Sequence, residues 1–124
     1  MKKHLVTGSS GFLGSAIVRK LVSQGEKVVS LDILEDIEIS KISEFYKFDI
    51  SDKSLNYNDI FKNVDYVHHN AALVPLTKAG NNFFKANVLG TQNILEQSIK
   101  NGVGHFSHMS SSAIFGKPEK NKNS

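Results

Sequence analysis

Three glycines near the start of the chain are spaced so that they could hold a diphosphate group. Gly8, Gly11 and Gly14 follow the apolar segment 4–7 and open an amphipathic segment that begins near residue 12. A strand, a tight turn and a helix N-terminus in this order aim backbone N–H groups and the positive end of the helix dipole at one anion. The glycines would allow the sharp turn, the approach of the diphosphate and the close packing of helix on strand. The pattern therefore predicts a dinucleotide-binding turn.

An acidic residue ends the next predicted strand. Asp32 follows the apolar segment 27–31, roughly 20 residues after the first glycine. A carboxylate at this place can accept hydrogen bonds from the adenosine ribose hydroxyls, and it repels a 2′-phosphate. The spacing therefore favours NAD over NADP. The alternative is a glycine-rich turn without a ligand, with Asp32 as an ordinary solvated loop residue.

Short apolar segments and longer amphipathic segments alternate along the chain, and they must position these groups. We expect strands at 4–7, 27–31, 44–48, 65–69 and 105–109, helices at 12–22, 52–62 and 81–100, and a loop or short helix at 33–43. This order predicts an α/β fold, a Rossmann-like doubly wound parallel sheet of about five strands with helices on both faces. In the last helix the apolar residues mostly share one face: Phe84, Val88, Ile94, Leu95 and Ile99.

The candidate residues follow the ends of the predicted strands. Ligands of open α/β sheets bind outside the carboxyl ends of the strands. The residues at those ends are Gly8, Asp32, Asp49, the segment Asn70-Ala71-Ala72, and Ser110 to Ser112. We therefore expect all five strand ends to contribute to one crevice.

Composition restricts the class of protein. The 124 residues suffice for one domain with a core, and 40% hydrophobic and 22% charged residues are ordinary for a soluble globular protein. The absence of cysteine excludes disulfides, thiol nucleophiles and cysteine-bound metals. No apolar run approaches the roughly 18 residues of a membrane span, and no signal-peptide segment precedes the first strand. We therefore expect a cytoplasmic protein that does not bind membranes.

Two groups of residues could indicate nucleic-acid binding or metal binding. Lys117, Lys120 and Lys122 lie close together in a chain of net charge +3, and we interpret them as a solvated tail, since no nucleic-acid-binding motif accompanies them. Four histidines could suggest a metal site: His68, His69, His105 and His108. Their spacings place partners on opposite faces of a strand, so we expect structural histidines and no metal site. By its position in the motif, His69 is the one expected to approach the cofactor.

Six pieces of the sequence together resemble the NAD-dependent epimerase/dehydratase family, within the extended short-chain dehydrogenase/reductase superfamily. They occur in the family's order and cover nearly the whole chain: 7–14, Asp32, 49–50, 69–72, 87–91 and 110–116. The resemblance implies an NAD-binding domain at 1–116, incomplete at its C-terminal side, and an exposed polar tail at 117–124. The family acts mostly on nucleotide-sugars, so the resemblance implies a small-molecule substrate of this kind for the whole protein.

The resemblance also implies which residues contact NAD. They are Gly8, Ser10, Gly11, Phe12, Leu13, Gly14, Asp32, Asp49, Ile50, Asn70, Ala71, Ala72 and Asn87. The glycine loop, with the amides of Phe12 and Leu13, would hold the pyrophosphate, and Asp32 the adenine ribose. Asp49 and Ile50 would contact adenine. The small alanines would let the cofactor pass close over the fourth strand, and Asn87 would tie the long helix to that strand's end.

The catalytic hydroxyl that the resemblance implies is Ser111, four residues before the aromatic Phe115, with Ser112 as the next candidate. In the family a tyrosine takes the alcohol proton, a lysine four residues later assists it, and NAD accepts a hydride. This sequence contains no Tyr-x-x-x-Lys pair, which the family places after the serine motif. We therefore expect a fragment without turnover of its own.

Two alternatives to a nucleotide-sugar epimerase or dehydratase stay open. One is a sterol- or flavonol-type dehydrogenase of the same superfamily, and the other is a non-catalytic regulatory protein that binds NAD. A Tyr-x-x-x-Lys pair roughly 20 to 30 residues beyond Ser111 would favour an enzyme. A homodimer of the full-length protein is a further expectation from the resemblance.

Overall fold

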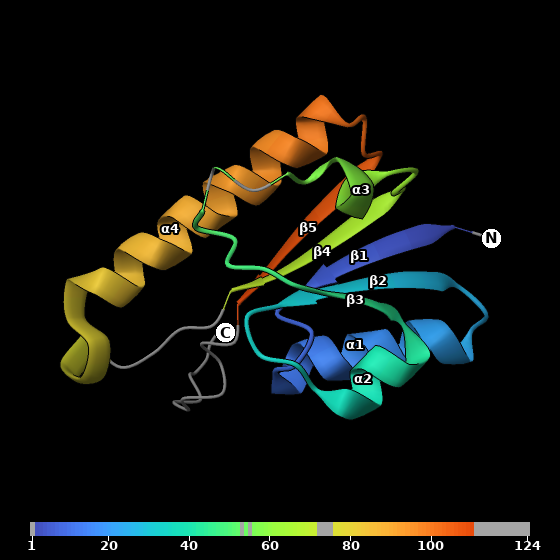
Figure 1. Ribbon diagram of the computed structural model, residues 1–124, viewed down its shortest axis with the longest axis horizontal. Helices are drawn as coiled ribbons and strands as arrows, with labels where there is room; N and C mark the ends of the chain where they lie inside the picture. Colours follow the sequence, from blue (N-terminus) through green and yellow to red (C-terminus); the bar gives the residue numbers. More distant parts are fainter. Residues whose placement is uncertain (1, 53, 55, 72–75, 111–124) are drawn as a thin grey trace, which may run out of the picture.

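Five parallel strands form one sheet in the order β3-β2-β1-β4-β5 (Figure 1). The computed structural model describes residues 2–52, 54, 56–71 and 76–110. The strands are β1 (Lys3–Thr7), β2 (Lys27–Asp32), β3 (Glu44–Lys47), β4 (Tyr66–Ala71) and β5 (His105–Ser110). The predicted α/β class and the Rossmann-like sheet of about five strands are confirmed, with strand boundaries within two residues of those expected.

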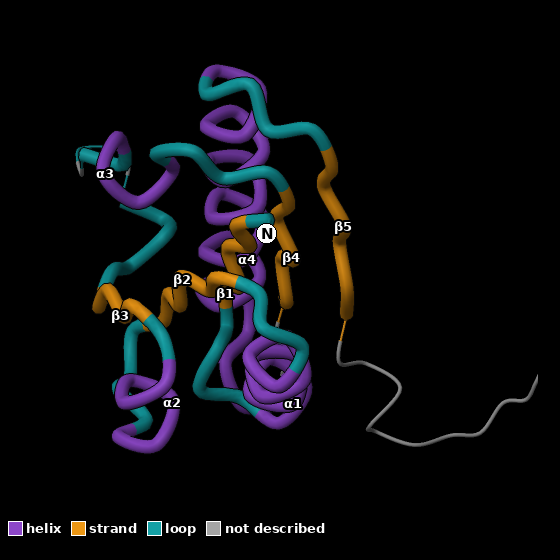
Figure 2. The backbone as a smooth tube through the Cα atoms, turned by 90° about the vertical axis from the view of Figure 1, so that its right-hand side faces the viewer, coloured by secondary structure: helices purple, strands orange, loops and turns teal. Residues whose placement is uncertain are grey.

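In the part of the chain that the structure describes, four helices cover the sheet on both faces (Figure 2). They are α1 (Phe12–Ser23), α2 (Ile37–Ile42), α3 (Asn58–Phe61) and α4 (Leu76–Lys100). α1 and α2 lie on one face, and α3 and α4 lie on the other. The central strands are therefore buried on both sides, which explains why β1 and β2 read as nearly continuous apolar runs.

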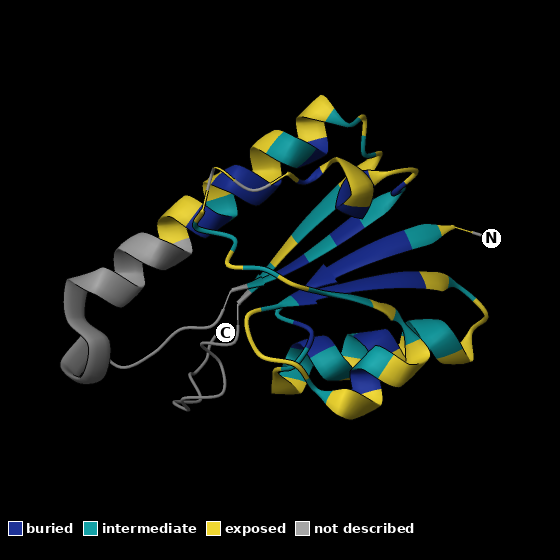
Figure 3. Ribbon diagram, viewed as in Figure 1, coloured by how far each residue is buried: buried dark blue, intermediate teal, exposed yellow. Residues whose placement is uncertain are grey.

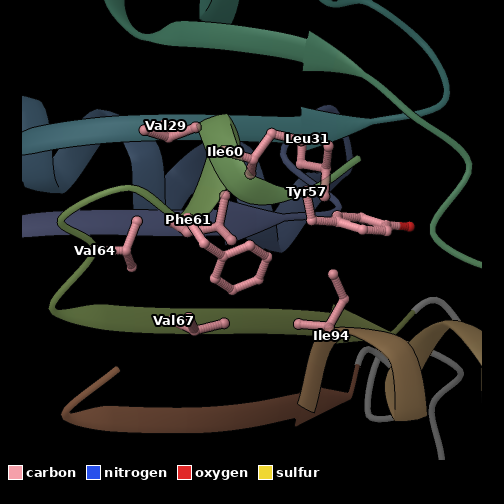
Figure 4. Close-up of a cluster of buried hydrophobic side chains, with 9 residues drawn as sticks. Val29, Leu31, Tyr57, Ile60, Phe61, Val64, Val67 and Ile94 are labelled. Atoms are coloured by element: carbon pink, nitrogen blue, oxygen red, sulfur yellow. The ribbon is translucent and has the colours of Figure 1, made fainter. Parts of the chain in front are cut away.

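Alternation along the strands divides the core into two clusters. Leu5 and Val67 point toward α3 and α4, where they pack with Phe61 and Ile94 (Figure 4). The residue after Leu5, Val6, points to the other face and packs beneath α1. Figure 3 shows the buried positions concentrated along the central strands. The core thus holds β1, β2 and β4 in a rigid platform from which the loops at their carboxyl ends extend.

One predicted helix is wrong. Residues 52–62 do not form a continuous helix: of the described residues in this range, only the single turn α3 at Asn58–Phe61 is helical. The Asp49 carboxylate accepts a hydrogen bond from the N–H of Ser51. In the same way, the Asp52 carboxylate accepts one from the N–H of Ser54. Short polar side chains that bond to nearby N–H groups stabilise turns at the expense of helix. The short helix anticipated within 33–43 is confirmed as α2.

The buried face of α4 differs from the predicted one. Ile94 is fully buried, but Val88, Leu95 and Ile99 are 40%, 41% and 74% exposed. In its described part the helix instead buries Gly90, Asn93, Ile94 and Ser98, most of which are small or polar. The small residue Gly90 allows the close approach of the Ile50 side chain. α4 also begins at Leu76, earlier than predicted, since no proline interrupts residues 76–100. Among the described helices, none is both long enough and apolar enough to cross a membrane.

Candidate cofactor-binding site

The glycine loop between β1 and α1 has the shape of an anion cradle. Gly8 has φ +65°, a left-handed conformation that favours glycine, and a Cβ there would lie 2.9 Å from the carbonyl oxygen of Asn70. A Cβ on Gly14 would overlap the backbone of Gly8, so α1 sits directly against the turn. A Cβ on Gly11 would meet only the Gly8 carbonyl oxygen, at 3.4 Å. The loop is therefore closed toward the sheet and open above Gly11.

The N-terminus of α1 leaves its N–H groups without an internal partner. Its N-cap residue, Gly11, provides no side-chain cap, and its first turn contains no acidic residue. The first N–H groups of a helix have no acceptor within the helix, and the dipole makes this end positive. The loop and helix end together fit a diphosphate, and Phe12 and Leu13 carry the first helical N–H groups.

Asp32 joins the end of β2 to the glycine loop. Its Oδ2 accepts a hydrogen bond from the Ser10 N–H at 2.9 Å, and its Oδ1 accepts from the N–H groups of Ile33 and Leu34 at 2.7 and 3.2 Å. The Ser10 hydroxyl donates to the Leu34 carbonyl oxygen at 2.6 Å. Asp32 is half-buried, and each carboxylate oxygen can accept more than one hydrogen bond. The carboxylate can therefore hold the loop and still accept a ribose hydroxyl.

Asn70, near the end of β4, is tied to the end of β1. Its backbone N–H donates to the Thr7 hydroxyl oxygen at 3.1 Å, and its side-chain Nδ2 donates to the Thr7 carbonyl oxygen at 2.9 Å. The remaining side-chain oxygen, Asn70 Oδ1, is buried and accepts no hydrogen bond from the described residues. The Ser9 hydroxyl is likewise buried without a partner there. Such orphaned polar atoms beside the loop are consistent with a polar ligand or water at this place.

The segment predicted to contact adenine is held by α4. The Ile50 carbonyl oxygen accepts a hydrogen bond from Asn93 Nδ2 at 2.7 Å. The Ile50 side chain lies against Gly90, where a Cβ would come within 2.6 Å of it. Asp49 is exposed, and its Oδ1 also accepts from the Ser51 hydroxyl at 2.7 Å. The Asp49 carboxylate thus faces solvent, whereas the Ile50 side chain packs toward the helix.

His69 does not face the crevice, contrary to the prediction. It is 1% exposed, on the face of the sheet that α4 covers, with Nδ1 2.7 Å from the Thr7 hydroxyl and Nε2 2.9 Å from the Thr91 hydroxyl. Burial, and to a lesser extent the charge of His108, lowers the pKa of His69 to about 4. The imidazole is therefore neutral at pH 7. His68 points to the other face, where its Nε2 lies 2.9 Å from His4 Nδ1. Burial and the nearby His4 and His105 lower its pKa.

The structure brings together the predicted cofactor residues at the ends of β1, β2 and β4. The sequence patterns missed Asn93 and the pairing of Thr7 and Thr91 with His69, although Thr7 directly precedes Gly8. Ala71 and Asn87 lie in β4 and α4, but their side chains are outside the described part. Ala72, Ser111 and Ser112 lie outside the described residues altogether. The described part of the site can bind an anion and hydroxyl groups; the predicted catalytic hydroxyls stay a prediction.

Comparisons with known proteins agree with this geometry. The family model for the NAD dependent epimerase/dehydratase family matches residues 4–124. A putative UDP-glucose 4-epimerase from Methanocaldococcus jannaschii is 39% identical over 121 residues, which cover 92% of this chain and 40% of that protein. The chain thus spans well under half the length of this relative.

Solved structures show the same similarity. UDP-glucose 4-epimerase from Thermotoga maritima, solved with UDP-glucose, superposes with a TM-score of 0.78 at 32% identity and covers 96% of this chain and 41% of that one. The Thermus thermophilus UDP-glucose 4-epimerase, in complex with NAD, gives a TM-score of 0.71 at 32% identity. The match covers 82% of this chain and 35% of that one. Each match therefore includes most of this chain but only a part of the solved protein.

Proposed function

The chain belongs to the NAD-dependent epimerase/dehydratase family, and on this premise we propose that it is the NAD-binding part of an enzyme that acts on a nucleotide-sugar. The observation that supports the proposal best is the bond between Asp32 and the glycine loop. It joins the carboxylate proposed to bind ribose to the loop proposed to bind diphosphate. Dinucleotide recognition requires these two contacts at the same time.

In this proposal, different residues contact different parts of the cofactor. The N–H groups of the loop 8–14 hold the pyrophosphate, and Asp32 accepts hydrogen bonds from the hydroxyls of the adenine ribose. Asp49, whose carboxylate faces solvent, accepts a hydrogen bond from the exocyclic amine of adenine, and the Ile50 backbone borders the same ring. Ala71 and Ala72 leave room for the cofactor over β4, and Asn87 supports that strand end from α4. Bound NAD would supply the hydride acceptor.

The proposed catalytic step needs a Tyr-x-x-x-Lys pair, which this sequence does not contain. We assign Ser111, with Ser112 as the next candidate, to orient the substrate oxygen, and the base to a Tyr-x-x-x-Lys pair beyond Ser111. In a protein that carries this pair, Ser111→Ala should lower the turnover of a nucleotide-sugar such as UDP-glucose and leave NAD affinity nearly unchanged. Wild-type turnover would refute the assignment. The 124-residue chain itself should show no turnover.

Calorimetric titration of the 124-residue chain with NAD and with NADP tests cofactor binding. We expect NAD to bind more tightly than NADP, because Asp32 repels a 2′-phosphate. Asp32→Ala should weaken NAD binding about tenfold or more and reduce the preference over NADP. Glu96→Ala, which removes an exposed carboxylate from α4, is the control and should bind NAD like the wild type. Equal affinities for both cofactors in the wild type and in Asp32→Ala would refute the ribose assignment.

We also propose that the protein dimerises through the outer face of α4. Val88, Leu95 and Ile99 are exposed and lie on one side of the helix, opposite Gly90 and Ile94. Exposed apolar residues in a row are typical of a protein interface. Sedimentation equilibrium should show a dimer that Ile99→Glu dissociates and that Lys100→Glu, a neighbouring exposed control, does not. A monomeric wild type would refute this part of the proposal.

A further inference from the structure

One buried imidazole connects the three elements that border the candidate site. His69 lies between the Thr7 hydroxyl, at 2.7 Å from Nδ1, and the Thr91 hydroxyl, at 2.9 Å from Nε2. Thr7 directly precedes the turn at Gly8, and His69 directly precedes Asn70. Thr91 lies on α4. The hydrogen bonds thus run from β1 through β4 to α4, beneath the point where the glycine loop and the end of β4 meet.

The directions of these hydrogen bonds follow from their donors. The Asn70 N–H donates to the Thr7 hydroxyl oxygen, so the Thr7 hydroxyl hydrogen is free to donate to His69 Nδ1. Nδ1 then carries no proton, and Nε2–H donates to the Thr91 oxygen. With the opposite tautomer, the Thr7 oxygen would accept two hydrogen bonds and its own hydrogen would find no acceptor among the described residues. In the Nε2–H form the Thr91 hydroxyl hydrogen can donate to a carbonyl oxygen of the preceding turn of α4, as helical threonines do. Thr7 lies in a strand and has no such carbonyl, so the Nε2–H form is the favoured tautomer.

Few charges face His69. From β5, Phe106 and His108 stack on its ring, with ring centroids 6.1 and 5.4 Å away. β1 and α4 contribute the two threonines. Of these neighbours only His108 can carry a charge, and it is exposed. Burial and His108 both hold the pKa of His69 low, in agreement with a neutral ring.

We propose that His69 is a positioning residue for the cofactor: its Nε2–H form sets the distance between the Gly8 turn and Asn70 and couples both to α4. The two backbones are already close, since a Cβ on Gly8 would lie 2.9 Å from the Asn70 carbonyl oxygen. Loss of the imidazole would free the Thr7 hydroxyl to rotate and release the Asn70 N–H. The statement about the cofactor rests on the proposed NAD binding, whereas the coupling of the two loops does not.

The coupling can be tested without any ligand, by NMR on the 124-residue chain. The ¹⁵N shifts of His69 at pH 7 should show the Nε2–H tautomer. His69→Phe should accelerate hydrogen exchange at the Asn70 N–H about tenfold relative to the Gly25 N–H, which bonds to Val22 at the far end of α1. His69→Gln can accept from Thr7 and donate to Thr91, so it should restore slow exchange.

Two further variants separate positioning from general stability. Thr91→Val removes a single hydrogen bond and gives a milder form of the same effect if His69→Phe does not fold. His108→Phe keeps the stacking on His69 and should change nothing. The coupling is overturned if His69 carries its proton on Nδ1, if Asn70 and Gly25 accelerate equally in His69→Phe and in Thr91→Val, or if His69→Gln behaves like His69→Phe.

NAD titration then tests the role in cofactor binding. We expect His69→Phe to weaken NAD binding about fivefold or more, and His69→Gln to bind within about twofold of wild type. Wild-type affinity in His69→Phe would overturn the positioning role. If the wild type itself binds no NAD, the proposed function fails, whereas hydrogen exchange still decides whether His69 couples the loops.

Discussion

The carboxylate of Asp32 accepts a hydrogen bond of 2.9 Å from the backbone N–H of Ser10, so the end of β2 holds the glycine loop in place. A second bond, from the Ser10 hydroxyl to the Leu34 carbonyl oxygen, closes the same junction. The group proposed to recognise ribose is therefore also a structural part of the loop proposed to hold the diphosphate. These bonds lie within the chain and fix the shape of the loop, and a fixed loop lowers the entropic cost of binding.

Asp32→Ala should destabilise the ligand-free chain. The change leaves the N–H groups of Ser10, Ile33 and Leu34 without their charged acceptor, and we expect a loss of about 1–3 kcal/mol in the free energy of unfolding. Urea denaturation measures this difference. Glu96→Ala should stay within about 0.5 kcal/mol of wild type. Equal stability of Asp32→Ala and wild type would mean that the carboxylate does not hold the loop.

Alanine at Gly14 and at Gly11 should separate folding from binding. A methyl group on Gly14 would lie 2.7 Å from the carbonyl carbon of Gly8, and backbone cannot yield as a side chain does. We expect Gly14→Ala to cost about 3 kcal/mol or more. Gly11→Ala meets only one atom, at 3.4 Å, and should cost no more than about 1 kcal/mol. Thermal unfolding with NAD titration checks both, and Gly11→Ala should bind NAD at least about tenfold more weakly. Wild-type NAD affinity in Gly11→Ala would contradict the proposed path of the diphosphate.

The free energy of unfolding should decrease as the pH falls from the pKa of an exposed histidine to the lower pKa of folded His69. The pKa of His69 is about 4 in the folded chain, whereas an exposed histidine has a pKa of about 6.5. Between these values the unfolded state binds more protons than the folded state, so the free energy of unfolding falls with falling pH. The loss is complete near pH 4 and amounts to at most about 3 kcal/mol. The lowered pKa of His68 acts in the same direction.

Urea denaturation between pH 4 and pH 7 measures this dependence. His69→Gln has no titrating group at this position, so its unfolding free energy should vary less with pH than that of the wild type. Parallel pH profiles for the two proteins would show that His69 titrates normally in the folded chain.

Asn93→Ala should loosen the segment at residues 49–51. Asn93 is 4% exposed and donates to the Ile50 carbonyl oxygen at 2.7 Å, so its loss leaves a buried acceptor without a partner. We expect a destabilisation of about 1–3 kcal/mol. Asn101→Ala is a control just beyond the end of α4, because among the described residues the Asn101 side chain bonds to Gln97 alone, four positions earlier. If both variants lose the same stability in urea, the bond to Ile50 has no special weight.

The strands were predictable because each has a local signature. The segments 4–7 and 27–31 are short apolar runs bounded by polar residues and glycines, and both became buried central strands. The helix expected at 52–62 was not predictable from apolar spacing, because the Asp49 and Asp52 side chains stabilise turns there. Its apolar residues Ile60 and Phe61 still reach the core, but from one helical turn.

The face of α4 shows a second limit. Apolar spacing favoured a face that includes Val88, Leu95 and Ile99, yet those side chains are exposed. The helix instead buries Gly90, where a larger residue would collide with Ile50 in the loop after β3. Close packing over small residues outweighs the apolar pattern of the helix alone, and the pattern contains no information about the surface that the helix meets.

The sequence by itself determined the α/β class, the glycine loop, the acid at the end of β2 and the family, because each depends on residues that are near one another in the chain or on a recurrent spacing. Only the tertiary structure decided the partners of His69 and of Ile50. Thr7 and His69 are 62 positions apart, and Ile50 and Asn93 are 43 positions apart. Such pairs meet only after parallel strands have aligned in register and α4 has packed across them, so no local pattern of residues specifies them.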